Sequence, residues 1–319
     1  MANVDLFLMP DVPVPRYLEM ARLAEASGCE HLWLIDGQDV FPDPWATAAL
    51  CAANTSRIGI GPGVTNPITR HPRVTANAML TIHDISNGRG ILGLGAGDNA
   101  VRTLGRRPAT MAEIREAVDI CRQTFRERRA DIPIYVAANG PKLAAYACAA
   151  ADGIMVPCIG TPDDLRRTLD RTDAAARGAG RDLREFPVLV YVGFAISHHR
   201  REALDDARGG IARRVLNFVY YPQHFPPELE PLRHEVEALA RGYNYNQHLK
   251  SHVSHTHLVS DALMDAARIA GTPQEVLIKF RALWKETVGL KATFFLRPDG
   301  RGKQRSFALF VREVWPALR

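Results

Sequence analysis

The sequence predicts a (β/α)8 barrel, and three observations lead to this fold class. Short apolar runs typical of β-strands alternate with amphipathic stretches of helical period along most of the chain. Strands that alternate with helices form parallel sheets through right-handed crossovers. Eight such units in 319 residues, 46% of them hydrophobic, suit a closed barrel with one large core better than an open sheet. We therefore expect residues 1–319 to form a single TIM-barrel domain.

The first four units follow from the spacing of apolar residues. Each strand is a short apolar run, and each helix repeats apolar residues three and four positions apart, as in Tyr17, Met20, Ala21 and Ala24. Strands are expected at Val4–Met9, His31–Ile35, Ile58–Pro62 and Gly90–Leu94. The helices that follow them are expected at Arg16–Ser27, Pro44–Asn54, Arg73–Ser86 and Met111–Arg128.

The last four units repeat this alternation, with one interruption between the seventh and eighth strands. Strands are expected at Ile132–Ala137, Gly153–Pro157, Val188–Ile196 and Lys291–Leu296. Helices are expected at Lys142–Ala150, Asp163–Gly178 and Lys303–Pro316.

The interruption is a long insertion, from His198 to about Gly271, in which no strand is expected. Its segment Phe218–Pro227 cannot be a regular helix interior, because prolines break the helical hydrogen bonding. An insertion after the seventh strand should rise over the barrel mouth, where long loops serve as lids or binding walls. A packing or dimerisation element is the alternative. The aromatic residues of the insertion favour a fairly large or partly planar substrate. They are Phe218, Tyr220, Tyr221, Phe225, Tyr243 and Tyr245.

The composition excludes several classes of protein. Forty Lys and Arg against 35 Asp and Glu give a net charge of +5, and no basic run is dense enough for a nucleic-acid groove. Five cysteines without a CxxC pair indicate buried thiols in a reducing compartment. No secretory leader and no apolar stretch of about 18 residues is present, so we expect a cytoplasmic protein without a membrane span.

Two strand ends carry most of the functional information. Each begins as an apolar run that is followed by glycines and polar residues. The two segments are Gly61–Pro72 and Ile91–Asp98. In α/β proteins the junction between a parallel strand and the next helix is where chemistry usually lies. Glycine lets the backbone approach a ligand closely. Thr65, Asn66 and Asp98 then offer hydrogen-bonding groups at this junction.

These strand ends belong to a set of motifs that resembles one family. The chain is similar to the bacterial luciferase-like flavin and deazaflavin oxidoreductases, above all to the coenzyme F420-dependent branch that includes methylenetetrahydromethanopterin reductase. The segments that carry the resemblance are Gly63–Pro72, Leu92–Asp98 with Leu104 and Gly105, Trp33–Asp36, Ala138–Lys142 and, more loosely, Ala270–Val276.

The resemblance implies a hydride-transfer enzyme that uses F420 on a small-molecule or peptide-borne substrate, and it implies a homodimer. A flat tricyclic ring would lie in the barrel mouth, backed by a non-proline cis peptide at Gly63–Val64. An ordinary β-bulge there is the alternative. The cofactor phosphate would lie at Asn139 and Gly140, where a helix begins; a simple tight connection is the alternative. The implied cofactor-binding residues are Asp36, Gly63, Val64, Thr65, Asn66, Asp98, Asn139, Gly140, Cys158, Ile159 and Gly160.

Asp36 and Asp98 are the candidate catalytic acids. Asp36 precedes Gly37 and Gln38, whereas related sequences often carry a histidine after the equivalent acid. Asp36 could also only cap the next helix. We therefore favour Asp98 as the group that protonates the atom beside the hydride acceptor.

Other functions remain open at this level. An FMN-dependent monooxygenase on the same fold is the nearest alternative, and a binding barrel without turnover or a metal-dependent hydrolase are more distant ones. Eight of the eleven histidines lie between His198 and His257, but without a matched acid they do not form a recognisable metal motif. We expect no metal site. The histidines in question include His248, His252, His255 and His257.

Overall fold

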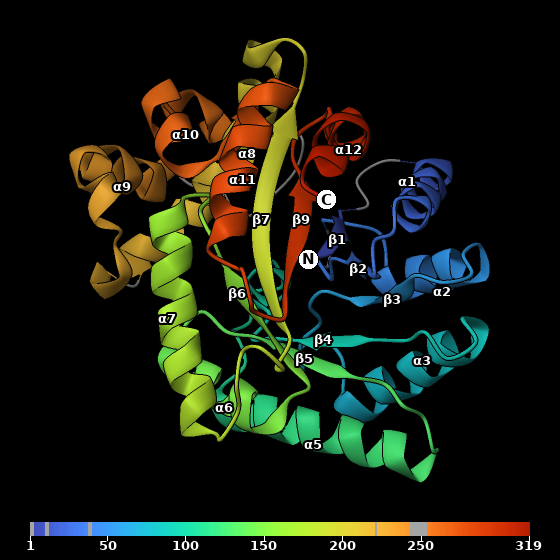
Figure 1. Cartoon of the computed structure of the whole chain (residues 1–319). Helices are drawn as coiled ribbons and strands as arrows, with labels where there is room; N and C mark the ends of the chain where they lie inside the picture. The colour runs from blue at the N-terminus through green and yellow to red at the C-terminus, as the bar shows by residue number, and fades with distance from the viewer. Residues whose placement is uncertain (1–2, 10–12, 38–39, 221, 243–253) are drawn as a thin grey trace.

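The computed structural model describes residues 3–9, 13–37, 40–220, 222–242 and 254–319 (Figure 1). Parallel strands form its centre, in the order β3-β2-β1-β9-β7-β6-β5-β4, and β8 pairs with β7 outside this path. Isolated bridges Ile60–Gly90 and Thr65–Leu94 connect β3 with β4 and nearly close the barrel. The predicted barrel is confirmed. The strands are β1 Asn3–Leu8, β2 His31–Leu34, β3 Gly59–Pro62, β4 Leu92–Leu94, β5 Ile134–Ala137, β6 Gly153–Pro157, β7 Val188–Ile196, β8 Ile269–Gly271 and β9 Ala292–Pro298.

Helices surround the strands, and most begin at a proline or a side-chain cap (Figure 1). Pro44, for example, is the first residue of its helix, and Asp43 before it accepts hydrogen bonds from two first-turn amides. The α-helices are α1 Val14–Ala26, α2 Pro44–Ala53, α3 Pro72–Ile85, α4 Asp98–Arg102, α5 Met111–Glu127, α6 Pro141–Ala150, α7 Pro162–Gly178, α8 Arg200–Tyr220, α9 Arg233–Gly242, α10 Asp261–Ala267, α11 Pro273–Lys285 and α12 Lys303–Leu309.

Two hydrophobic layers hold the barrel together. The outer layer lies between strands and helices, and the inner one fills the barrel with large side chains, including Trp33, Tyr135 and Phe295. Trp33 contacts the other two rings edge-on, at centroid distances of 5.6 and 5.8 Å. Because the interior is packed, the barrel is no pore, and a ligand site has to lie at its open end.

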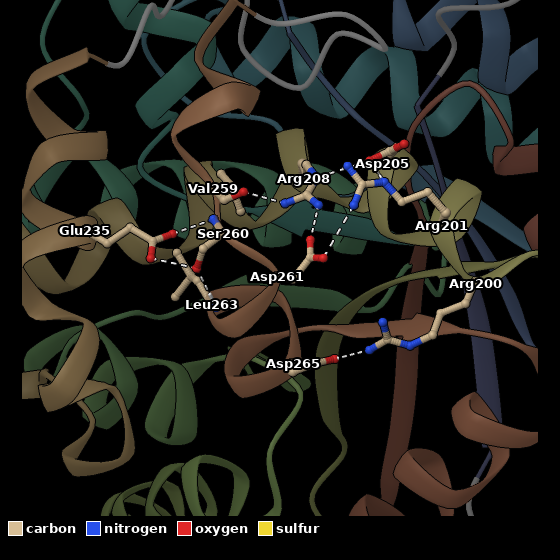
Figure 2. Close-up of polar contacts among 10 residues, drawn as sticks. All are labelled: Arg200, Arg201, Asp205, Arg208, Glu235, Val259, Ser260, Asp261, Leu263 and Asp265. Atoms are coloured by element: carbon tan, nitrogen blue, oxygen red, sulfur yellow. Dashed lines mark hydrogen bonds and ion pairs between the residues drawn. The ribbon is translucent and has the colours of Figure 1, made fainter.

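The insertion has its own hydrophobic core, built from α8, α9, α10 and the 3-10 turns η2 (Pro227–Leu232) and η4 (Ser254–Leu258). Figure 2 shows how polar groups tie it together. Arg208 of α8 donates to the carbonyl of Val259 and to the carboxylate of Asp261. Glu235 of α9 accepts from the amide and the hydroxyl of Ser260, both at 2.7 Å. These contacts therefore join α8, α9 and the start of α10 within the insertion. That the whole chain is one domain stays a prediction.

Three expectations about the elements are wrong in detail. The insertion between His198 and Gly271 does contain a strand, β8, whose three residues pair with the end of β7. The fourth strand is followed first by a short helix that was not expected, α4, which begins at Asp98. The last helix ends at Leu309 and continues as a π-helical turn, η5 (Phe310–Val314), and a 3-10 turn. Phe218 belongs to α8, and the chain leaves the helix before Pro222, as the prolines predict.

A buried acid at the amino-terminal end of the barrel makes stability depend on pH. Asp5 accepts hydrogen bonds from the His31 amide and ring, both at 3.0 Å, and from the Trp33 indole at 2.9 Å. Burial alone would lower the pKa of His31, but the charges of Asp5 and Glu30 outweigh burial and raise it above 6.5. Protonated His31 therefore stabilises the fold at low pH.

We expect the free energy of unfolding to fall as pH rises from about 6.5 through the raised pKa of His31. Urea unfolding at a series of pH values measures this, with His31→Gln as the control that should remove the pH-dependent part. Parallel pH profiles for the wild type and the variant would contradict the assignment to His31.

Candidate active site

A cavity of about 730 Å³ opens at the carboxyl ends of the barrel strands, beneath α8. Residues that follow β2, β3, β4 and β5, together with the last residues of β6, line one part of it. Residues of α8 and of the 3-10 turn η1 (Pro222–His224) line another part, so the insertion does form a wall of the site. A cavity of this size takes a ligand with a tricyclic ring together with a substrate.

One part of the cavity lies at the ends of β3, β4 and β5, and we call it the slot. Gly63, Val64, Gly95 and Ala137 line it, and the peptide bond Gly63–Val64 is cis, as the resemblance implies. A Cβ atom on Gly95 would lie 2.7 Å from Cγ2 of Val64, so only glycine lets the two strand ends come this close. The slot is therefore lined by small, apolar groups.

Gly63 is needed by the barrel interior as well as by the slot. A Cβ atom there would lie 2.8 Å from Cβ of Trp33 and 3.1 Å from Cζ of Phe295. A larger residue at position 63 would disturb the packed core. Such a variant therefore cannot separate an effect on ligand binding from an effect on packing.

Thr65 and Asn66 lie directly behind the cavity surface. The Thr65 hydroxyl donates to Oδ2 of Asp36 at 2.6 Å, and Asp36 lines the cavity. Asn66 Oδ1 accepts from the amides of Ile68 and Thr69, whereas its buried Nδ2 has no hydrogen-bond partner in the described structure. Both side chains thus hold the end of β3 in place. The Nδ2 group of Asn66, which lies next to Gly97, keeps a hydrogen-bond donor available.

The beginning of α6 is open to the cavity. Asn139, Gly140, Lys142 and Leu143 line it, and Gly140 is an N-cap without a side-chain hydrogen bond. The first-turn amides of a helix have no partner within the helix and carry a partial positive charge. A phosphate group fits such a place, as the sequence predicts for Asn139 and Gly140.

Cys158, Ile159 and Gly160 lie behind the cavity wall, whose nearest lining residues are Val156 and Pro157. The Gly160 amide donates to Sγ of Cys158 at 3.3 Å, and the Ile159 amide donates to Asp164 at 2.9 Å. Burial and the charge of Asp164 raise the pKa of the Cys158 thiol to about 12. These groups fix the loop after β6, and their role as ligand contacts stays a prediction.

The two candidate acids differ in their surroundings. Asp36 is only 5% exposed. The side chain of Asp98 is 35% exposed and forms an ion pair with Arg102 one helical turn further on. An ion pair with arginine uses the ionised carboxylate, so the geometry favours Asp36 over Asp98 as a proton donor.

Sequence reasoning missed part of the cavity wall. Arg214 and Asn217 of α8, Gln223 and His224 of η1, and Arg297 of β9 all line the cavity. Arg297 could have been found, since it stands at the end of a strand and is followed by Pro298, Asp299 and Gly300. The residues of α8 carry no such signal.

The predicted aromatic and histidine residues of the insertion lie in different surroundings. Phe218 and Phe225 pack against each other at 5.9 Å between centroids, within the core of the insertion. Burial and Arg171 lower the pKa of His224. The remaining predicted groups lie outside the described residues or have undescribed side chains: Tyr220, Tyr221, Tyr243, Tyr245, His248, His252 and His255.

The described part of the chain brings together one group that could hold a metal ion, and it lies outside this cavity. Asp5, Glu30 and His31 place ligand atoms within 4.8 Å of one another. Both oxygens of Asp5 already accept hydrogen bonds from nitrogen donors, which suits an ion pair with His31.

Comparison with known proteins places the chain in a family. Residues 4–290 match the family model described as luciferase-like monooxygenase. The chain belongs to this family. It is 30% identical over 338 residues to a 5,10-methylenetetrahydromethanopterin reductase of Archaeoglobus fulgidus, which covers 97% of this chain and 98% of that protein. A reductase of the same name from Methanolobus tindarius is 27% identical over 329 residues, covering 96% and 97%.

Solved structures agree with this placement. The coenzyme F420-dependent tetrahydromethanopterin reductase of Methanopyrus kandleri superimposes with a TM-score of 0.80, at 26% identity, over 100% of this chain and 99% of that chain. The resemblance inferred from the strand-end motifs is thereby confirmed. None of the described helices has the length and apolar character that a membrane span requires.

Proposed function

We propose that this protein is a coenzyme F420-dependent oxidoreductase that transfers a hydride between the deazaflavin and an organic substrate. The observation that carries the proposal is the apolar slot beside an uncapped helix start, within one cavity. The F420 dependence of the M. kandleri relative supports the choice of cofactor.

The residues present fit this cofactor. Gly63, Val64, Gly95 and Ala137 would hold the ring, and the first-turn amides of α6 with Asn139 and Gly140 would hold the phosphate. When bound, F420 supplies a ring carbon that gives or accepts a hydride. The chain contributes orientation, and its apolar slot excludes water from the reacting bond.

A proton must reach or leave the atom next to the one that exchanges the hydride. Asp36 is placed for this, because it lines the cavity, is buried, and is held by the Thr65 hydroxyl. Asp98, which begins α4 at the same strand-end wall, would bind and orient rather than donate. The substrate is a small molecule or a group on a peptide with a C=C, C=N or C=O bond; the homodimer implied by the resemblance stays a prediction.

The proposal is tested by turnover. Anaerobic protein with reduced F420 is mixed with a panel of acceptors, including methylenetetrahydromethanopterin and simple enones, imines and ketones, and re-formation of oxidised F420 is followed by absorbance. We expect oxidation with at least one acceptor and none with protein omitted. In a parallel aerobic assay, protein-dependent oxygenation of an acceptor with reduced FMN, together with no F420-linked turnover, would favour the monooxygenase alternative.

A further inference from the structure

Three buried arginines gather where β7, β9 and α8 meet at the cavity. Arg214 is 8% exposed, and Arg268 and Arg297 are 2% exposed. Arg214 and Arg297 line the cavity, and Arg268 lies behind them. Guanidinium groups are rarely buried unless they bind a negatively charged partner.

One carboxylate serves two of these guanidinium groups. Nε of Arg268 donates to Oδ2 of Asp299 at 2.9 Å, and Nη2 of Arg297 lies 2.7 Å from Oδ1. Asp299 is itself 2% exposed. The Arg268–Asp299–Arg297 group thus brings two positive charges and one negative charge into a poorly solvated place, and Arg214 adds a third guanidinium to the same wall.

Two glycines make room for this arginine cluster. A Cβ atom on Gly210 of α8 would lie 2.4 Å from Nη2 of Arg297 and 2.7 Å from Nη2 of Arg268. A Cβ atom on Gly193 of β7 would lie 1.8 Å from the same atom of Arg268. A glycine inside a helix lowers its stability, by about 1 kcal/mol relative to alanine. The glycine at position 210 lets α8 pack closely against the guanidinium groups of Arg268 and Arg297.

Neutral groups complete the wall. Tyr191 lines the cavity, and the Arg297 guanidinium lies 5.4 Å from the centroid of its ring. Asn217 follows Arg214 by one turn of α8 and also lines the cavity. The carboxylates among the described lining residues, Asp36 and Asp98, come after β2 and β4 instead.

We infer that Arg214 and Arg297 form a binding site for an anionic group of the substrate, a carboxylate or a phosphate. Guanidinium groups in a poorly solvated wall form strong paired hydrogen bonds with such planar or multivalent oxyanions. Arg268 and Asp299 position Arg297 from behind. The site is separate from the start of α6, because β6 and β7 lie between β5 and β9 in the strand order.

The inference rests on the proposed function at one point, that the cofactor phosphate occupies the start of α6. Its test therefore uses inorganic phosphate as probe, by equilibrium dialysis, on the protein alone and on the protein saturated with F420. The variants are Arg214→Gln, Arg297→Gln and the double variant. Arg312→Gln is the matched control, an exposed arginine that does not line the cavity.

With F420 bound, so that the start of α6 is occupied, we expect the double variant to bind phosphate at least about 10-fold more weakly than the wild type, because it removes charge-assisted hydrogen bonds. Arg312→Gln should leave binding unchanged, and F420 should leave the arginine-dependent site available. Unchanged binding in the double variant would overturn the inference. So would complete competition by F420 for the arginine-dependent site, since the arginines would then serve the cofactor.

Folding of each variant is checked by circular dichroism. If Arg297→Gln does not fold, Arg214→Gln alone carries the test, because the Arg268–Asp299 pair stays intact in it. A wild type that binds no F420 would contradict the proposed function, whereas the phosphate titration of the protein alone would still decide the anion site.

Discussion

Asp36→Asn should slow hydride transfer by about 10²-fold or more, the usual loss when a general acid is removed, while F420 affinity stays within a few-fold. The reason is positional: Asp36 is buried, lines the cavity, and accepts a hydrogen bond from Thr65 at 2.6 Å. Asparagine keeps the shape of the side chain but cannot exchange a proton. Single-turnover absorbance with an accepted substrate measures the rate, and a direct titration measures the affinity.

Asp98→Asn is the matched variant, since it makes the same change at the other acid of the cavity. Its effect on the rate should be smaller, because Asp98 is already engaged by Arg102. If Asp98→Asn slowed hydride transfer strongly and Asp36→Asn turned over normally, Asp98 would be the proton donor, as the sequence alone suggests. Normal turnover in both would leave His224 or water as the proton source.

Gly140→Asp should weaken F420 binding by about 10²-fold without lowering stability. A Cβ atom on Gly140 meets nothing within 4 Å, and the residue is an N-cap in an extended conformation that aspartate adopts easily. Two negative charges about 4 Å apart near a protein surface repel by about 4 kcal/mol, enough for a loss of this size even after screening by salt.

Gly140→Asn separates charge from shape. It caps the helix in the same way but carries no charge, so its affinity for F420 should fall much less than that of Gly140→Asp. Fluorescence titration gives both affinities, and thermal unfolding should show both variants at least as stable as the wild type. Equal affinities in the two variants would mean that no phosphate lies at the start of α6.

The fold could be predicted from the sequence because each strand and helix carries its own periodic pattern. β6 and β7 have the bounds that their apolar runs predict, and most other elements differ by one or two residues. β8 could not be found in this way, since three residues have no period and exist as a strand only by pairing with β7. The short helix α4 was hidden by the glycines before it, although Asp98 and Arg102 have the i, i+4 spacing of a helical ion pair.

The strand-end half of the site was predictable for a similar reason. Asp36, the Gly63–Val64 bond and the start of α6 each follow a strand, and parallel strands bring their carboxyl ends to one edge. The arginine wall depends instead on the fold, which brings Arg214, Arg268 and Arg297 to one place from distant parts of the chain. No local pattern specifies that Gly210 faces a guanidinium cluster, so only the three-dimensional structure reveals it.

The central claim is that this cavity takes F420, and a direct equilibrium titration of the purified protein with F420 and with FMN tests it. We predict saturable binding of F420 that is tighter than that of FMN, and weaker binding of F420 in Gly140→Asp. Binding of FMN as tight as or tighter than that of F420 would contradict the claim.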